Sequence, residues 1–154
     1  MSNIIKNAIN ASATNIGFKK AFGHWYKESE EVIVVLNLQK SGYSSLYYLN
    51  IKIYIRGIFN LSYEISKHLI INDTGNIFRR EPVEYKSIMN LDNEMDDFER
   101  VAGIERMFKD FMAPFVDKAL TLRGILVLVD ENKIFLLPAV KIELEKLLEN
   151  RRTS

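Results

Sequence analysis

The chain of 154 residues contains no cysteine, and its only histidines are His24 and His68. The absence of cysteine excludes disulfide bonds, thiolate zinc sites, iron–sulfur clusters and cysteine nucleophiles. The two histidines lie 44 residues apart in the sequence and belong to no local metal-binding motif. We therefore expect no metal site and no cofactor, and we expect each histidine to be a partly buried structural residue.

Glycine and proline are also few, at seven and three residues. No glycine cluster lies between an expected strand and an expected helix, so no phosphate-binding loop is indicated. The acidic residues 92–97 lack the glycine and distal glutamate of an EF-hand loop, and carboxylates at this density are typical of a helix start. Lys40 is a conceivable nucleophile, but nothing near it in sequence would lower its pKa. We expect no catalytic residues and no enzymatic activity.

An excess of one charge and long apolar runs are likewise missing. The net charge is +1; residues 1–90 hold eleven Lys/Arg against seven Asp/Glu, and residues 91–154 hold ten against thirteen. This asymmetry would orient a partner without holding it. The N-terminus has no signal-peptide pattern, and runs such as residues 125–129 are too short to span a bilayer. We expect a cytoplasmic protein with no membrane partner, and nucleic acid is not an expected partner.

The strongest positive pattern is an alternation of apolar and polar residues in residues 32–55, which predicts a β-hairpin. If Gln39 faces Tyr48, then Asn37 faces Asn50, and Leu36 faces Ile51 on the opposite side of the sheet. One register therefore satisfies both faces of the pair. The apolar face should be buried, with Trp25 and Phe18 also in the core.

The other face of this hairpin is polar and aromatic, and its turn is polar as well. We interpret the face as an exposed surface that binds a partner, against the alternative of an ordinary solvated strand face. The candidate partner-binding residues are Asn37, Gln39, Lys40, Ser41, Tyr43, Tyr48, Asn50, Lys52 and Tyr54.

The remaining patterns predict one α+β domain over residues 1–154, sheet-rich in residues 15–88 and helix-rich in residues 90–150. A curved antiparallel sheet of about four strands would be packed by an N-terminal helix over residues 3–14 and by C-terminal helices. Strands are expected near residues 24–26, 68–71 and 77–79, the last two as a second hairpin.

A helix with a four-turn apolar stripe follows residue 97, with Pro114 expected to kink or divide it. Residues 122–137 fit a hairpin or a helix capped by Thr121, and that choice stays open. Pro138 is expected to begin the last helix.

Several short stretches carry a resemblance to a known family: Gly17-Phe18-Lys19-Lys20, Trp25-Tyr26, residues 36–41 and residues 47–51, followed by His68-Leu69-Ile70 and Arg79-Arg80. In these stretches, which span about the first half of the chain, the sequence resembles the bacterial family called domain of unknown function 4304. The resemblance implies an α+β domain with a curved antiparallel sheet and no established activity.

These observations favour a non-enzymatic protein-interaction domain that binds another protein through the polar and aromatic sheet face. By analogy with families of this size, the expected interaction domain could be an immunity-type protein that neutralises a toxin. The alternative is weak RNA binding, because tyrosines alternate with Lys40, Lys52, Arg56 and Arg79-Arg80 as in a base-stacking sheet. The near-zero net charge argues against that alternative.

Overall fold

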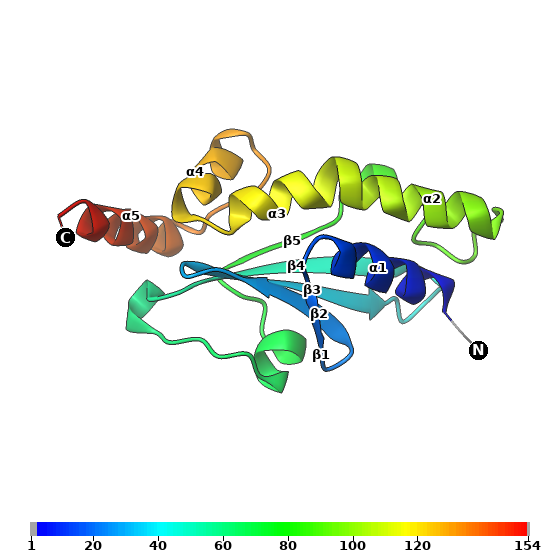
Figure 1. Ribbon diagram of the computed structural model, residues 1–154, viewed down its shortest axis with the longest axis horizontal. Helices are drawn as coiled ribbons and strands as arrows, with labels where there is room; N and C mark the ends of the chain where they lie inside the picture. The colour runs from blue at the N-terminus through cyan, green and yellow to red at the C-terminus, as the bar shows by residue number, and fades with distance from the viewer. Residues whose placement is uncertain (1–2, 154) are drawn as a thin grey trace.

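The structure, a computed structural model, describes residues 3–153. In these residues, antiparallel strands form one open sheet, and their order in the sheet is the same as their order along the chain (Figure 1). The strands are β1 (Lys19–Ala21), β2 (His24–Glu28), β3 (Val32–Lys40), β4 (Tyr47–Ile55) and β5 (Ile77–Arg80). The α+β fold with an N-terminal helix and C-terminal helices is therefore confirmed. Strand β1 was not among the expected strands, and a tight turn with positive φ at Phe22 and Gly23 folds it back on β2.

The register predicted for the central hairpin is confirmed. Gln39 lies opposite Tyr48, Asn37 opposite Asn50, and Leu36 opposite Ile51, as do the other predicted pairs of β3 and β4. A shift of one residue would turn the apolar row away from the core, so the alternation excludes such a shift.

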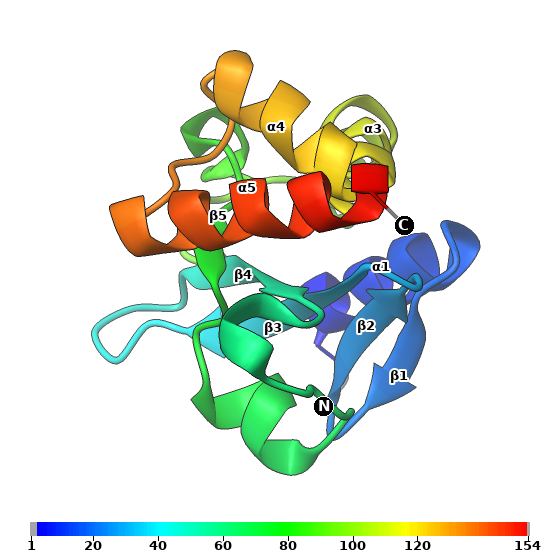
Figure 2. The same cartoon turned by 90° about the vertical axis from the view of Figure 1, so that its left-hand side faces the viewer.

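Helices cover one face of the sheet, where the main core lies (Figures 1 and 2). The N-terminal helix α1 (Ile4–Asn15) begins at Asn3, whose side chain accepts hydrogen bonds from the backbone N–H groups of Ile5 and Lys6. Trp25 lies in the core beneath α1 and is fully buried, and its indole Nε1 donates to Asn10 Oδ1 at 2.8 Å. The predicted helix over residues 3–14 and the core position of Trp25 are both confirmed.

The long helical run behind the sheet is divided as expected. It comprises α2 (Asp97–Met107), a π-helical turn η4 (Phe108–Met112) and α3 (Ala113–Ala119). Pro114 has no N–H to donate to the carbonyl of residue 110, and its ring would clash with that carbonyl in a regular α-helix. The wider π turn directly before it relieves that clash. Six side chains of the predicted apolar stripe are buried against the sheet: Ile104, Met107, Phe108, Met112, Phe115 and Ala119.

Residues 122–137 follow the helical alternative in their first half, and the hairpin alternative is wrong. Helix α4 (Leu122–Asp130) begins at Thr121, whose hydroxyl accepts from the N–H of Gly124 at 2.9 Å. A Cβ at Gly124 would lie 1.8 Å from the carbonyl oxygen of Lys118, so α4 approaches the end of α3 more closely than a larger residue allows. Helix α5 (Pro138–Thr153) begins at the predicted proline.

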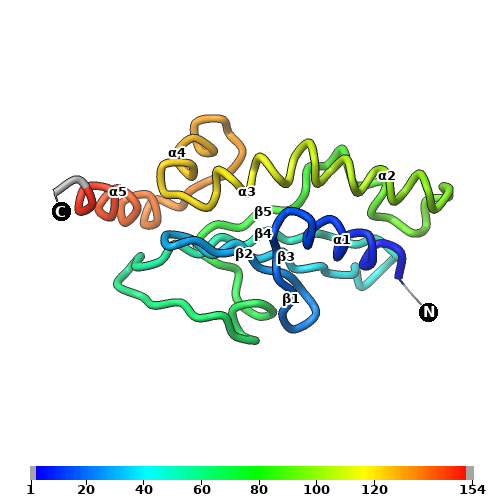
Figure 3. Tube along the Cα trace, in the orientation of Figure 1, coloured from blue at the N-terminus to red at the C-terminus, as the bar shows by residue number. Residues whose placement is uncertain are grey.

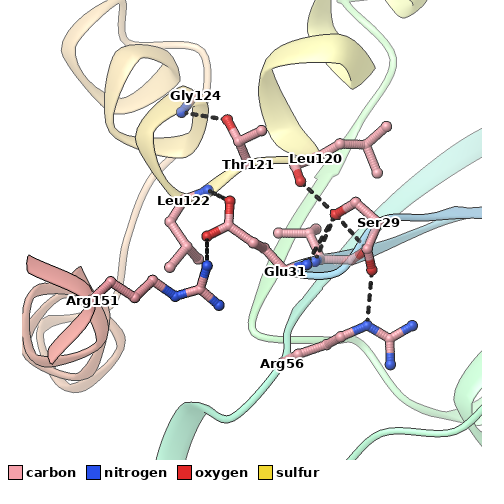
Figure 4. Close-up of polar contacts among 9 residues, drawn as sticks. Ser29, Glu31, Arg56, Leu120, Thr121, Leu122, Gly124 and Arg151 are labelled. Atoms are coloured by element: carbon pink, nitrogen blue, oxygen red, sulfur yellow. Dashed lines mark hydrogen bonds and ion pairs between the residues drawn. The ribbon is translucent and has the colours of Figure 1, made fainter. Parts of the chain in front are cut away.

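A polar joint connects the turn before β3 to α4 and α5 (Figure 4). The Glu31 carboxylate accepts from the N–H of Leu122 at 3.3 Å and pairs with the guanidinium of Arg151. The Ser29 hydroxyl donates to the carbonyl of Leu120 at 2.6 Å. These contacts hold the C-terminal helices at one end of the sheet, and α1 begins near the other end of the long axis (Figure 3).

The segment between β4 and β5 covers the second face of the sheet, opposite the helices (Figure 1). The strand predicted at residues 68–71 is wrong, because this stretch is a π-helical turn, η2 (His68–Asn72). The predicted strand at residues 77–79 is confirmed as β5, but it pairs with β4. Gly75 has a φ of +79°, and a Cβ there would lie 2.9 Å from the Ile53 carbonyl oxygen, so the loop before β5 needs glycine to lie this close to β4.

Two short 3₁₀ turns complete the described chain, η1 (Ile58–Asn60) after β4 and η3 (Val83–Tyr85) after β5. Among residues 3–153, no helix combines the length and the apolar character that crossing a bilayer would require.

We predict that Leu36→Ala and Ile51→Ala each lower the free energy of unfolding by about 2–5 kcal/mol, because both side chains are fully buried and their truncation leaves a cavity. Urea denaturation measures the change. Ile142→Ala, at an exposed position of α5, is the matched control and should change stability by less than about 0.5 kcal/mol. Equal effects at the three positions would contradict the assignment of the core.

Candidate functional site

The nine residues predicted to bind a partner divide into a buried and an accessible group. The buried ones are Asn37, Asn50, Lys52 and Tyr54. The accessible ones lie at the hairpin end of β3 and β4, and we call them the hairpin-end surface: Gln39, Lys40, Ser41, Tyr43 and Tyr48. The expectation that the whole polar face is open to solvent is therefore wrong for its central part.

The central part of the face is buried because it is partly apolar and lies beneath η2. Ile33, Val35 and Tyr54 alternate with the core-facing row, and they form a second apolar cluster with Leu69 and Ile70 of η2. The sequence pattern was ambiguous here, since a strand covered on both faces loses the clean alternation of a half-exposed strand.

Three polar side chains of the sheet fasten η2 through its backbone carbonyl groups. Lys52 Nζ donates to the carbonyl of Ile70 at 2.9 Å, and Asn37 Nδ2 donates to the same oxygen at 3.1 Å. The Tyr54 hydroxyl donates to the carbonyl of Leu69 at 2.7 Å. These donors satisfy carbonyl oxygens near the end of a short helical turn, where a cation also complements the backbone dipoles.

A second network runs from these residues toward the hairpin end. Asn50 Nδ2 donates to Gln39 Oε1 at 2.9 Å and to Asn37 Oδ1 at 3.3 Å. Arg80 Nε donates to Asn50 Oδ1 at 3.0 Å, and the Arg80 guanidinium lies 3.9 Å from the centroid of the Tyr48 ring. Arg80 was not among the predicted partner-binding residues, although its place in an alternating strand would put it on this face.

The tyrosines and cations of this face do not form an exposed surface on which nucleic-acid bases can stack. Tyr54 and Lys52 are buried, and Arg80 covers a face of the Tyr48 ring. Arg79 lies over the Phe111 ring at 4.8 Å and donates to the carbonyl of Lys133. Since bases stack on free aromatic faces, this geometry gives no support to the RNA alternative.

A pocket of about 420 Å³ opens between this polar network and the loop after η2. It is lined by His24, Asn37, Leu38, Gln39, Asn50, Lys52, Ile71, Asn72, Asp73, Thr74 and Phe78. His24, expected from sequence to be a structural residue, joins this pocket because β2 pairs with β3 in the sheet. His24 is partly buried as predicted, whereas His68 is exposed, so the same prediction is wrong for His68.

Burial and local charge shift the titration of the pocket residues. Burial is the main cause of a lowered pKa for Lys52, and the negative charge of Asp73 partly offsets it. Burial also lowers the pKa of His24, and the positive charges of Lys52 and Lys6 add to the effect. The described residues contain no group of three or more side chains able to hold a metal ion.

The loop that carries Tyr43 is anchored on both sides. The N–H of Ser41 donates to the carbonyl of Leu46 at 2.8 Å, which closes the loop. The N–H of Leu91 donates to the carbonyl of Ser45 at 3.0 Å, and Asp92 Oδ2 accepts from the N–H of Ser45. Tyr43 is fully exposed at the tip of this anchored loop.

The geometry defines an open-sheet α+β domain with a polar pocket and a presented hairpin end. The chain belongs to the family described as Domain of unknown function (DUF4304), whose match covers residues 9–118, more than half of the sequence. The match includes the whole sheet, the segment that covers its second face and the candidate residues, and it ends before α4. No curated protein and no solved structure matches the chain.

We predict that Tyr54→Phe lowers the free energy of unfolding by about 1–3 kcal/mol, because it leaves the buried carbonyl of Leu69 without its hydroxyl donor. Tyr43→Phe removes the same atom at a fully exposed position and should leave stability within about 0.5 kcal/mol of the wild type. Urea denaturation of both variants measures the difference. A silent Tyr54→Phe would mean that η2 is not fastened to the sheet through this bond.

The lowered pKa of His24 predicts a loss of stability as the pH falls below about 6.5, the ordinary value for histidine. In that range His24 is protonated more readily in the unfolded chain than in the folded protein. The free energy of unfolding therefore decreases as the pH falls from about 6.5 to the lowered pKa of the folded state. Urea denaturation at pH 7.5 and pH 5.5 should show this decrease, and His24→Gln should reduce it. His68→Gln is the control and should keep the wild-type difference; a reduction in both variants alike would contradict the assignment.

Proposed function

We propose that this protein is a bacterial, cytoplasmic, non-enzymatic interaction domain that binds another protein through its hairpin-end surface. The observation that carries the proposal is the presentation of Tyr43, whose ring is fully exposed on a loop that backbone hydrogen bonds hold on both sides. An ordered loop loses little conformational entropy when it binds. Tyrosine is also one of the residues that most often dominate the energy of a protein interface.

The neighbouring side chains support the same reading. Gln39 and Tyr48 are held by Asn50 and Arg80, so the polar part of the surface is also ordered before binding. The residues of the hairpin-end surface include Lys40 and no acidic residue, and the exposed Arg80 lies beside Tyr48, whereas Lys52 is buried and adds no charge to this surface. A partner with a complementary acidic surface would therefore be oriented by charge and held by the tyrosine.

Site-specific photo-cross-linking in cells tests this proposal. A photoreactive phenylalanine analogue placed at position 43 should trap a discrete protein, because position 43 lies at the centre of the proposed interface. The same analogue at Phe135, an exposed aromatic residue between α4 and α5, is the matched control and should not trap that protein. Trapping at both positions with equal yield, or only at position 135, would contradict the proposed surface. Tyr43→Ser should also weaken binding of the purified partner.

The specific role that we propose for the interaction is an immunity-type role, in which the partner is a toxin. The support for it is the analogy with similar families, and the same experiment extends to it. The trapped partner should stop growth when expressed alone, and growth should return on co-expression of the wild type but not of Tyr43→Ser. A harmless partner would contradict the immunity role and leave the interaction proposal standing.

A further inference from the structure

The sheet side of the pocket beside the hairpin-end surface keeps hydrogen-bond donors that are free to meet a ligand. The side-chain oxygens of Asn37, Gln39 and Asn50 all accept hydrogen bonds from neighbouring side chains. Both amide hydrogens of Asn50 are used in these bonds, so the donors of β3 and β4 left to meet a ligand include N–H groups of Gln39 and Lys52. A pocket of this kind fits a ligand that brings its own acceptor oxygens.

Lys52 is the central donor and is only 3 % exposed. An ammonium group has three N–H donors, and one of them goes to the carbonyl of Ile70. Among residues 3–153, no carboxylate lies within 4.0 Å of Lys52 Nζ, so its charge has no direct ion-pair partner. A buried cation without such a partner is costly, and an anion in the adjoining pocket would offset that cost.

His24 provides a second donor at the same pocket. Its Nδ1 accepts from the backbone N–H of Leu38 at 3.0 Å, so the hydrogen of the neutral ring is on Nε2. This tautomer donates a hydrogen bond without acquiring a charge. The positive charges of Lys52 and Lys6 both act on this ring, and Asp73 is the carboxylate that lines the same pocket.

The remaining walls and the charge balance restrict the class of ligand. Leu38, Ile71 and Phe78 provide an apolar lining suited to a short aliphatic stem. Asp73 lines the pocket with a negative charge, and its Oδ1 already accepts from the N–H groups of Thr74 and Gly75. One lysine beside one aspartate matches a single negative charge better than the two charges of phosphate.

We propose that this pocket binds a carboxylate group on a short aliphatic stem, with Lys52 and His24 as the donors to its oxygens. Gln39 belongs both to the pocket lining and to the hairpin-end surface, so a protein docked on that surface could insert an acidic side chain. This source of the carboxylate rests on the proposed function; a small free carboxylic acid is the other source of the same chemistry.

Nuclear magnetic resonance of the two histidine rings tests the pocket in the isolated protein, with propionate as the probe at constant ionic strength. Propionate should shift the His24 ring signals in a saturable way, with a dissociation constant on the order of 1 mM for so small a ligand. It should also raise the pKa of His24, because it brings a negative charge to the ring. His68 is exposed outside the pocket and serves as an internal control that should not move.

Two variants distinguish a specific binding site from non-specific binding. Lys52→Met should weaken propionate binding about tenfold or more, because it removes a charged donor. Asp73→Asn keeps the side-chain oxygen that accepts from Thr74 and Gly75 but removes the competing charge, so it should tighten binding severalfold. This gain is informative even if Lys52→Met does not fold. Equal shifts of both histidines, unchanged or weaker binding by Asp73→Asn, or tighter binding of inorganic phosphate than of propionate would overturn the proposal.

The source of the carboxylate is decided by a second pair of probes. A glutamate with both backbone ends capped should bind at least as tightly as propionate if a partner supplies the group, whereas the capped glutamine should not bind. Binding of propionate but not of capped glutamate would indicate a small free acid and overturn the partner-derived source. These measurements use no partner protein, so failure at the pocket is separate from failure of cross-linking at position 43.

Discussion

The hydrogen bonds to the carbonyl oxygens of Leu69 and Ile70 decide which part of the second face of the sheet is buried. These oxygens lie in a short π-helical turn that is bonded to side chains of β3 and β4, and they must be satisfied where the turn is removed from water. Tyr54, Lys52 and Asn37 supply the donors. Once these bonds form, Leu69 and Ile70 can rest on the apolar residues of the face, and the central hairpin is buried on both sides.

This burial has a consequence for electrostatics at the edge of the covered region. Lys52 is taken out of water, with a carbonyl oxygen in hydrogen-bond contact and Asp73 near enough to affect its pKa. The same cover leaves a pocket where η2 ends, so the buried cation adjoins a volume that a ligand can enter. A structural requirement, the fastening of η2, thereby places a charged donor where recognition chemistry is possible.

The outer part of the hairpin is accessible and is held by contacts among side chains. Beyond Asn37 and Asn50 the face is no longer under η2, and Gln39, Tyr48 and Arg80 form an accessible set held by contacts with one another. The family match covers this set and the pocket. Helices α4 and α5 lie outside the matched residues and are joined to the sheet through Glu31 and Ser29. The proposed interaction therefore uses the part of the chain that is shared with the family.

The sequence by itself determined the elements with the strongest local signals. The pairing of like faces in β3 and β4 follows from their period of two, and α1 and α5 match the helix predicted over residues 3–14 and the helix predicted to begin at Pro138. Thr121 indicated the start of α4, but the hairpin alternative was excluded only by the structure. Local signals also located the hairpin-end residues that remain accessible. They were insufficient at residues 68–71, where β-branched and apolar residues suit a strand but form a π-helical turn that packs on the second face of the sheet.

Only the tertiary structure decided which polar residues are buried. Asn37, Asn50 and Lys52 look like surface residues in an alternating strand. Asn37 and Lys52 contact a turn that lies 18 or more residues further along the chain, and Asn50 bonds to Asn37, Gln39 and Arg80. The same long-range contact brings Asp73 beside Lys52, while the pairing of β2 with β3 brings His24 to the pocket. Burial and electrostatics depend on what covers a side chain in space, and a strand pattern encodes only which side of the sheet that side chain occupies.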